Sequence, residues 1–370
     1  MAMKKTLLSM LLIGGVSTLA SANAEIKDPY LEGFKAYAAE LKSMKDPTAQ
    51  AYAEYVSETQ KAERSAGYIG DEVTLPEPVK VTEGVYTVVG SMIWHNPTNF
   101  GLNNNLTFIE FEDGVFVFNA GPNTAVAYSF HQIIKRHTDK PVKWVAVENS
   151  QGHAYLGASY WVDVGVKNFY SHSVANQTFH KYFDEIKASW SLAVGNLITL
   201  PSRDVTAQFT EFDDPLVVET GGGESMTMLN FGAGHTPGST LVYIPSRNLL
   251  LTGDVAYNER SLALFAYTDT KKWVETFARM MEYVPEDVIV IPGHGAPTTM
   301  QRIKEDTYDY LVFLRAEVEA IIKAGGSESD VVMIDQSRYK DRPVYDQTHQ
   351  NNAVHIYKEM TGESLGESFE

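Results

Sequence analysis

Three residues in the second half of the sequence have the type and the placement of metal ligands. His235 lies in GHTPGS, Asp254 in LLLTGD and His294 in VIVIPGHG, and each follows an apolar run of strand type. Imidazole nitrogens and carboxylate oxygens are donors that proteins offer to zinc and other divalent transition metals. Because each residue stands where a strand is expected to run out into a loop, the three are predicted to form one metal site.

This ordered series resembles the metallo-β-lactamase superfamily. The resemblance extends from about Val81 to Ala296 and implies an α/β fold, the αββα sandwich, with helices added at both ends. In that family a further ligand segment, His-x-His-x-Asp-His, follows an earlier strand. This chain has KWVAVENSQGHAYLGA at the corresponding place. With Gly157 as the anchor of the alignment, the four ligand positions read Asn149, Gln151, His153 and Ala154.

The departures from the family pattern fall on one of its two metal positions. Asn149 and Gln151 are weak, neutral ligands, and Ala154 offers no donor atom. The family's Asp-Thr-Gly, whose aspartate supports the His-x-His segment, reads Asn119, Ala120 and Gly121 here. Since carboxylates of this kind orient and tune ligating imidazoles, their loss together with the histidines indicates that the first metal position has been abandoned.

His153 takes the place of the family's aspartate, which serves the second metal. The resemblance therefore implies a mononuclear site with His153, Asp254 and His294 as ligands, most simply for Zn²⁺, with Fe²⁺ or Mn²⁺ also suited to such a set. An alignment shifted by one residue is the alternative. It would put Ser150, Gly152, Ala154 and Tyr155 on the ligand positions and turn His153 away.

His235 would normally bind the abandoned metal. It either remains as a fourth ligand or stands beside the metal as a base. Four protein ligands close a tetrahedral site, whereas three leave room for a water molecule that the metal can acidify. The expected catalytic residues are His235 and Asp254, and the expected metal ligands are His153, His235, Asp254 and His294.

Alternating strands and helices are expected to position these residues. Apolar runs predict strands such as those in NNLTFIEF, GVFVFNA, VKWVAV, SMTMLNFG, TLVYIP, NLLLTG and VIVIP. Helical spacing predicts helices near 123–137, 174–188 and 270–283, a long helix ending at Gly325 and a final one near 349–361. The organisation expected is a helical extension over 25–78, including a helical pair in 28–66, a metallo-β-lactamase-like domain over 79–300, and a helical segment over 301–370.

The N-terminus reads as a cleaved secretory signal. Residues 1–24 contain Lys4 and Lys5, an apolar run too short to span a bilayer, and small residues before the expected cleavage point. We therefore expect a periplasmic or secreted protein without a stable membrane anchor. The sequence contains no cysteine, which excludes disulfides and thiolate ligands.

Composition narrows the class of function. The chain has 370 residues, of which 44% are hydrophobic, and a formal net charge of −17 at pH 7. Such a surface repels phosphate backbones, so a small-molecule substrate is expected rather than nucleic acid. The resemblance implies a hydrolase that activates water on an ester, lactone, lactam or similar bond. Two alternatives stay open, namely a non-catalytic binding protein of the same fold and a mononuclear non-haem iron enzyme.

Overall fold

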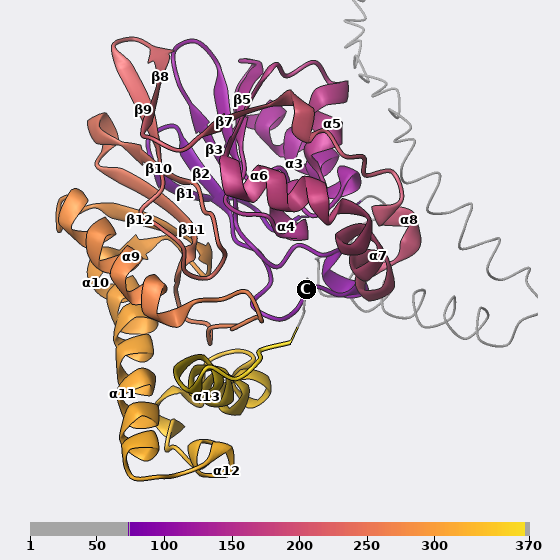
Figure 1. Ribbon diagram of the computed structural model, residues 1–370. Helices are drawn as coiled ribbons and strands as arrows, with labels where there is room; N and C mark the ends of the chain where they lie inside the picture. The colour runs from indigo at the N-terminus through magenta and orange to yellow at the C-terminus, as the bar shows by residue number, and fades with distance from the viewer. Residues whose placement is uncertain (1–72, 74, 367–370) are drawn as a thin grey trace, which may run out of the picture.

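Two β-sheets packed face to face, with helices on both outer sides, make up the protein (Figure 1). The computed structural model describes Val73 and residues 75–366. The expected signal segment at 1–24 and helical pair at 28–66 lie outside the described residues. Among the described helices, none is both long enough and apolar enough to cross a membrane.

The first sheet begins with antiparallel hairpins and continues with parallel strands. Its strands pair in the order of the sequence: β1 (Val79–Thr82), β2 (Val85–Val88), β3 (Leu106–Glu110), β4 (Val115–Phe118), β5 (Val142–Ala146), β6 (Asn168–His172) and β7 (Phe209–Phe212). The strands from β1 to β4 are antiparallel, and those from β4 to β7 are parallel. Successive side chains alternate between the faces, so Phe116 and Phe118 face the second sheet while Val115 and Val117 face helices.

The second sheet has the order β13-β12-β11-β10-β9-β8. Its strands are β8 (Leu216–Gly221), β9 (Glu224–Leu229), β10 (Leu241–Ile244), β11 (Leu249–Tyr257), β12 (Ile289–His294) and β13 (Thr298–Thr299). β11 and β12 are parallel, and the other pairs are antiparallel. Buried apolar side chains from both sheets meet between them, which confirms the αββα prediction.

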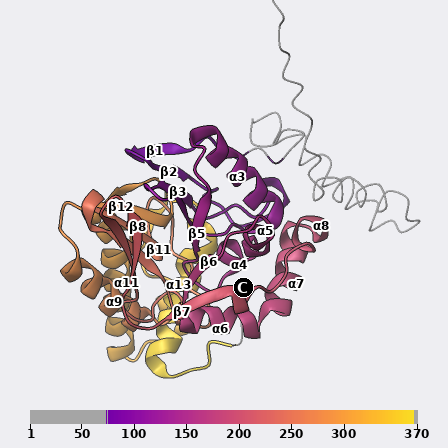
Figure 2. The same cartoon turned by 90° about the horizontal axis from the view of Figure 1, so that it is seen from above.

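Helices cover the outer face of each sheet (Figures 1 and 2). On the first sheet lie α3 (Thr124–His137), α4 (Gly152–Tyr155), α5 (Ala158–Asp163), α6 (Ser173–Lys181), α7 (Phe183–Val194) and α8 (Asn196–Thr199). On the second lie α9 (Thr270–Tyr283) and α10 (Met300–Ile303). The one helix expected near 174–188 is in fact two, α6 and α7, because the backbone leaves helical geometry at Tyr182.

The C-terminal segment adds a further helical layer. It contains α11 (Asp309–Lys323), α12 (Glu328–Val331) and α13 (Tyr345–Thr361). The long helix expected before Gly325 is interrupted by a π-helical turn at Lys304–Tyr308, between α10 and α11. Short 3₁₀ turns occupy Pro97–Asn99, Thr206–Gln208, Pro245–Arg247 and Ser337–Tyr339. α11 and α13 pack against Tyr257 and Trp273, which brings this layer next to the end of β11.

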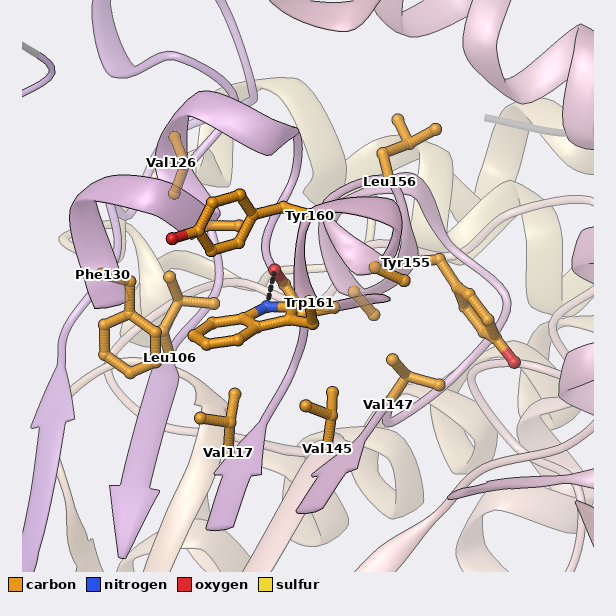
Figure 3. Close-up of a cluster of buried hydrophobic side chains, with 14 of the residues drawn as sticks. Leu106, Val117, Val126, Phe130, Val145, Val147, Tyr155, Leu156, Tyr160 and Trp161 are labelled. Atoms are coloured by element: carbon orange, nitrogen blue, oxygen red, sulfur yellow. Dashed lines mark hydrogen bonds between the residues drawn. The ribbon is translucent and has the colours of Figure 1, made fainter. Parts of the chain in front are cut away.

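The core under α3 and α5 is built around Trp161 (Figure 3). Its indole is completely buried among side chains from β4, β5 and α3, including Val117, Val145 and Phe130. Its Nε1 donates a hydrogen bond to the carbonyl oxygen of Ala120 at 3.0 Å. Trp161 therefore also supports the turn that follows β4.

Replacing this tryptophan should be among the costliest core changes. Trp161→Ala removes a large buried ring and leaves the Ala120 carbonyl without its donor, so it is expected to lower the free energy of unfolding by about 3–5 kcal/mol. Leu192→Ala, at a side chain on α7 that is 83% exposed, should change it by less than about 0.5 kcal/mol. Urea denaturation of both variants measures the difference. Equal stability would show that the cluster in Figure 3 is not a stabilising core.

Candidate metal centre

The structure brings the four expected ligands to one end of both sheets. His153 lies in the first turn of α4, just after β5, and His235 lies in the loop between β9 and β10. His294 is the last residue of β12. Asp254 was expected in a loop but lies inside β11, because this strand continues to Tyr257 through irregular pairing around Gly253.

The Asp254 carboxylate is the centre of the cluster. Its Oδ2 lies 3.5 Å from Nε2 of His153 and 3.4 Å from Nε2 of His235, and its Oδ1 lies 3.3 Å from Nε2 of His294. All four side chains are at most 3% exposed. One carboxylate thus gathers three imidazoles from separate segments of the chain.

Glu148 belongs to the cluster and was missed in the sequence. Its Oε1 lies 3.2 Å from Nε2 of His153. One donor atom each from Glu148, His153 and Asp254 lie within 4.8 Å of one another, which makes them the tightest set of possible ligands. The available signal was a single carboxylate directly after the apolar run VKWVAV, where a buried strand ends. A buried acid in such a place needs a partner.

Two asparagines hold Glu148 from the other side. Nδ2 of Asn104 and Nδ2 of Asn119 donate to Oε1 of Glu148 at 3.1 and 3.0 Å, and the backbone N–H of Glu148 donates to Oδ1 of Asn119 at 3.0 Å. A Cβ on Gly253 would lie 2.1 Å from Oε2 of Glu148, so only glycine fits there. The carboxylate that position 119 has lost is therefore replaced by one at position 148, in direct contact with it.

Burial sets the charges of the cluster. It lowers the pKa of His235 and that of His294 to about 4, so both imidazoles are neutral at pH 7. Burial alone would raise the pKa of Asp254, but His294 and the other imidazoles hold it below its usual value. Burial, followed by the nearby charge of Asp254, raises the pKa of Glu148. The cluster thus offers neutral imidazoles beside an ionised carboxylate, as a cation requires.

Asn149 and Gln151 are not arranged as ligands. Nδ2 of Asn149 donates to Oε1 of Gln151 at 3.0 Å, and the backbone N–H of Gln151 donates to Oδ1 of Asn149 at 2.8 Å. The same Gln151 oxygen lies 3.1 Å from Nε2 of His235, and its Nε2 donates to the Tyr267 hydroxyl at 3.1 Å. Ala154 is buried without a polar side chain. Position 151 therefore ties His235 to the loop before α9.

The donors fit one divalent transition metal. Ligand atoms about 2.0–2.2 Å from a shared ion lie at most about 4.4 Å apart, close to the spacing of Glu148, His153 and Asp254. Within the described residues, no hydrogen bond of good geometry reaches either Asp254 oxygen, Oε2 of Glu148 or Nδ1 of His294. Buried oxygens left in this state are stabilised by a cation.

Comparisons with known proteins agree with this fold. The sequence pattern of the metallo-beta-lactamase superfamily matches residues 149–294, from the loop after β5 to the last residue of β12. The resemblance seen in the sequence is thereby confirmed for this part of the chain, which is similar to the metallo-β-lactamase superfamily.

Solved structures show the same fold. A metallo-beta-lactamase from Pontibacter korlensis superposes with a TM-score of 0.50 and 18% identity over 64% of this chain and 98% of that one. TMB-1 superposes with a TM-score of 0.50 and 16% identity over 64% of this chain and 96% of that one. DIM-1 metallo-beta-lactamase superposes with a TM-score of 0.50 and 16% identity over 65% of this chain and 98% of that one. At this identity the likeness establishes the fold alone.

A cavity of about 90 Å³ opens onto the candidate metal centre. Trp94 and His95 both contribute to its wall, and His95 also stacks on Trp190 with ring centroids 4.1 Å apart. Arg260 lines the cavity although it is only 1% exposed. Its Nε donates to the Met92 carbonyl at 2.9 Å, and Nη2 has no hydrogen-bond partner among the described residues. A buried guanidinium is thus available to a bound group.

The C-terminal layer supports the loops around the candidate metal centre. The Thr268 hydroxyl donates to the His235 carbonyl at 2.9 Å, and Nε2 of His355 on α13 lies 3.0 Å from the Thr268 carbonyl. Trp94 Nε1 donates to the Gln347 side chain at 2.6 Å. The last helix, α13, is therefore connected to the surroundings of the metal centre through Thr268 and through Trp94.

The contact between Asn119 and Glu148 can be tested by exchanging their charges. Asn119→Asp restores the family's aspartate but places two buried carboxylates side by side, so the free energy of unfolding should fall by about 3 kcal/mol. In the double variant Asn119→Asp, Glu148→Gln a single carboxylate faces an amide again, and most of the stability should return. Urea denaturation measures both. If the double variant lost as much stability as the two single variants together, the two side chains would not interact directly.

Proposed function

We propose that the protein is an exported hydrolase with one divalent transition metal per chain, held by His153, Asp254 and His294. Glu148 is a further oxygen donor within reach of the same ion, so that a water molecule would enter as a fifth ligand. This proposal rests on the buried Asp254 carboxylate, which lies within 3.5 Å of three imidazole nitrogens. Export rests on the sequence of residues 1–24, and zinc is the metal proposed first because imidazole and carboxylate together suit it.

The bound metal would acidify a water molecule and polarise the oxygen of the bond under attack. The chain's own groups prepare that step. The rings of Trp94 and Phe265 form an apolar part of the wall of the small cavity and would limit the access of bulk water to it. The guanidinium of Arg260 is placed to stabilise negative charge that develops on a substrate oxygen. Esters, lactones and lactams share a carbonyl that meets these requirements.

His235 is proposed as a proton carrier rather than a ligand. Its Nε2 faces Oε1 of Gln151 at 3.1 Å, and an amide oxygen accepts hydrogen bonds only, so this nitrogen carries the proton. The same nitrogen is 3.4 Å from Oδ2 of Asp254. A proton at Nε2 of His235 can therefore form a hydrogen bond either with Oε1 of Gln151 or with Oδ2 of Asp254.

Metal content is the first test of this proposal. Protein purified without chelator should contain about one transition metal per chain by elemental analysis, since Asn149 and Gln151 bind each other instead of a second ion. Two tightly bound metals would contradict the mononuclear assignment. Protein without metal would favour a binding protein of the same fold, and iron would favour the non-haem iron enzyme considered above.

Ligand removal is the second test. His153→Ala should weaken metal binding by more than about 100-fold, because it removes a nitrogen from the tightest donor set. His172→Ala is the matched control, since Nδ1 of His172 accepts from the Val174 N–H outside the metal cavity. Competition with a chromophoric chelator measures both affinities. Equal effects of the two substitutions would remove His153 from the site.

A further inference from the structure

A second, larger cavity lies beside the metal centre. It has a volume of about 370 Å³, within the range of pockets that hold small molecules. One face of α6 lines it with Val174, Gln177, Thr178 and Lys181. These positions are spaced i, i+3, i+4 and i+7, so they form a single stripe along the helix. Ile186 on α7 and Pro237 on the loop after β9 contribute the facing walls.

Gln151 joins the two cavities. Its side chain lines both the 370 Å³ cavity and the 90 Å³ cavity at the metal centre. Its Nε2 donates to the hydroxyl of Tyr267, which also lines the larger cavity, while its Oε1 faces His235. A molecule that fills the larger cavity therefore contacts the residue that also borders the metal centre. The family's histidine at this position is replaced by a residue that touches both spaces.

The larger cavity suits an uncharged apolar group. Its lining is mainly hydrocarbon, from Val174, Ile186, Pro237 and the rings of Tyr182 and Tyr267. Lys181 is the cation in its wall, but its Nζ donates to the Tyr182 hydroxyl at 2.7 Å and lies 4.5 Å from the centre of that ring. At about 30 Å³ for a water-sized group, the volume holds on the order of ten methylenes.

We propose that this cavity binds the acyl chain of the substrate, so that the protein acts on esters or lactones of medium-length fatty acids. The proposal rests on the function proposed above for the metal centre. The chain would lie along α6 and α7 with its carboxyl end at Gln151, and movement of this side chain would open the way to the metal side. Each methylene moved from water into the cavity tightens binding by about fourfold.

Binding of neutral alkyl chains tests the cavity without depending on hydrolysis. Butanol, hexanol and octanol are titrated into the full-length protein as purified, and affinity is measured by calorimetry. Affinity should rise about tenfold or more for each two added methylenes. Val174→Trp and Thr178→Trp each place an indole in the cavity from α6 and should abolish this rise. Leu192→Trp, on the exposed side of α7, is the matched control and should preserve it.

The outcomes separate this inference from the function on which it rests. Affinity that does not change with chain length, or a rise that persists in both indole variants, overturns the acyl-chain site even if the protein binds metal and hydrolyses esters. A rise lost in the Val174 and Thr178 variants supports the site even if no metal is found. In that case the hydrolase proposal fails and the apolar binding site remains.

Discussion

Two carboxylates, Glu148 and Asp254, are buried side by side where the two sheets meet, and the rest of the site is arranged around them. Glu148 comes from the loop after β5 in the first sheet and Asp254 from β11 in the second. Buried like charges repel strongly, so each needs donors or a cation close by. Asn104 and Asn119 serve Glu148, whereas imidazoles serve Asp254. Because these partners belong to both sheets, the electrostatic requirement fixes how the sheets lie against each other at this end.

The substituted positions of the family's ligand segment have acquired structural roles. Asn149 and Gln151 complete a hydrogen-bonded turn, and Gln151 connects His235 with Tyr267. The change at position 119 is matched by a carboxylate at position 148. The positions that depart from the family pattern are therefore linked in space by polar contacts.

The sequence predicted the layers of the fold well because apolar alternation and helical spacing are local properties. It also placed His153, His235, Asp254 and His294 close together, since all lie near strand ends on the same side. It put Asp254 in a loop because a glycine at 253 reads as a turn, whereas the strand bends there and continues. Glu148 escaped notice because a single acid after an apolar run usually marks the surface.

Contacts between distant parts of the chain could not be predicted. His355 contacts Thr268, and Gln347 contacts Trp94, but no local sequence pattern predicts either pair. The break between α6 and α7 was missed for a related reason. Helical spacing continues across Tyr182, and only packing against the sheet shows where the axis turns.

The position of α13 affects the order in which the protein matures. A ribosome makes every proposed ligand before it makes residues 345–361, yet the loop that carries Thr268 is held by His355, and the first N–H groups of α9 are bound by the Glu359 carboxylate. The chain therefore contains its candidate ligands before it contains their support. The loop beside His235 and the start of α9 reach their final arrangement only when the last helix docks.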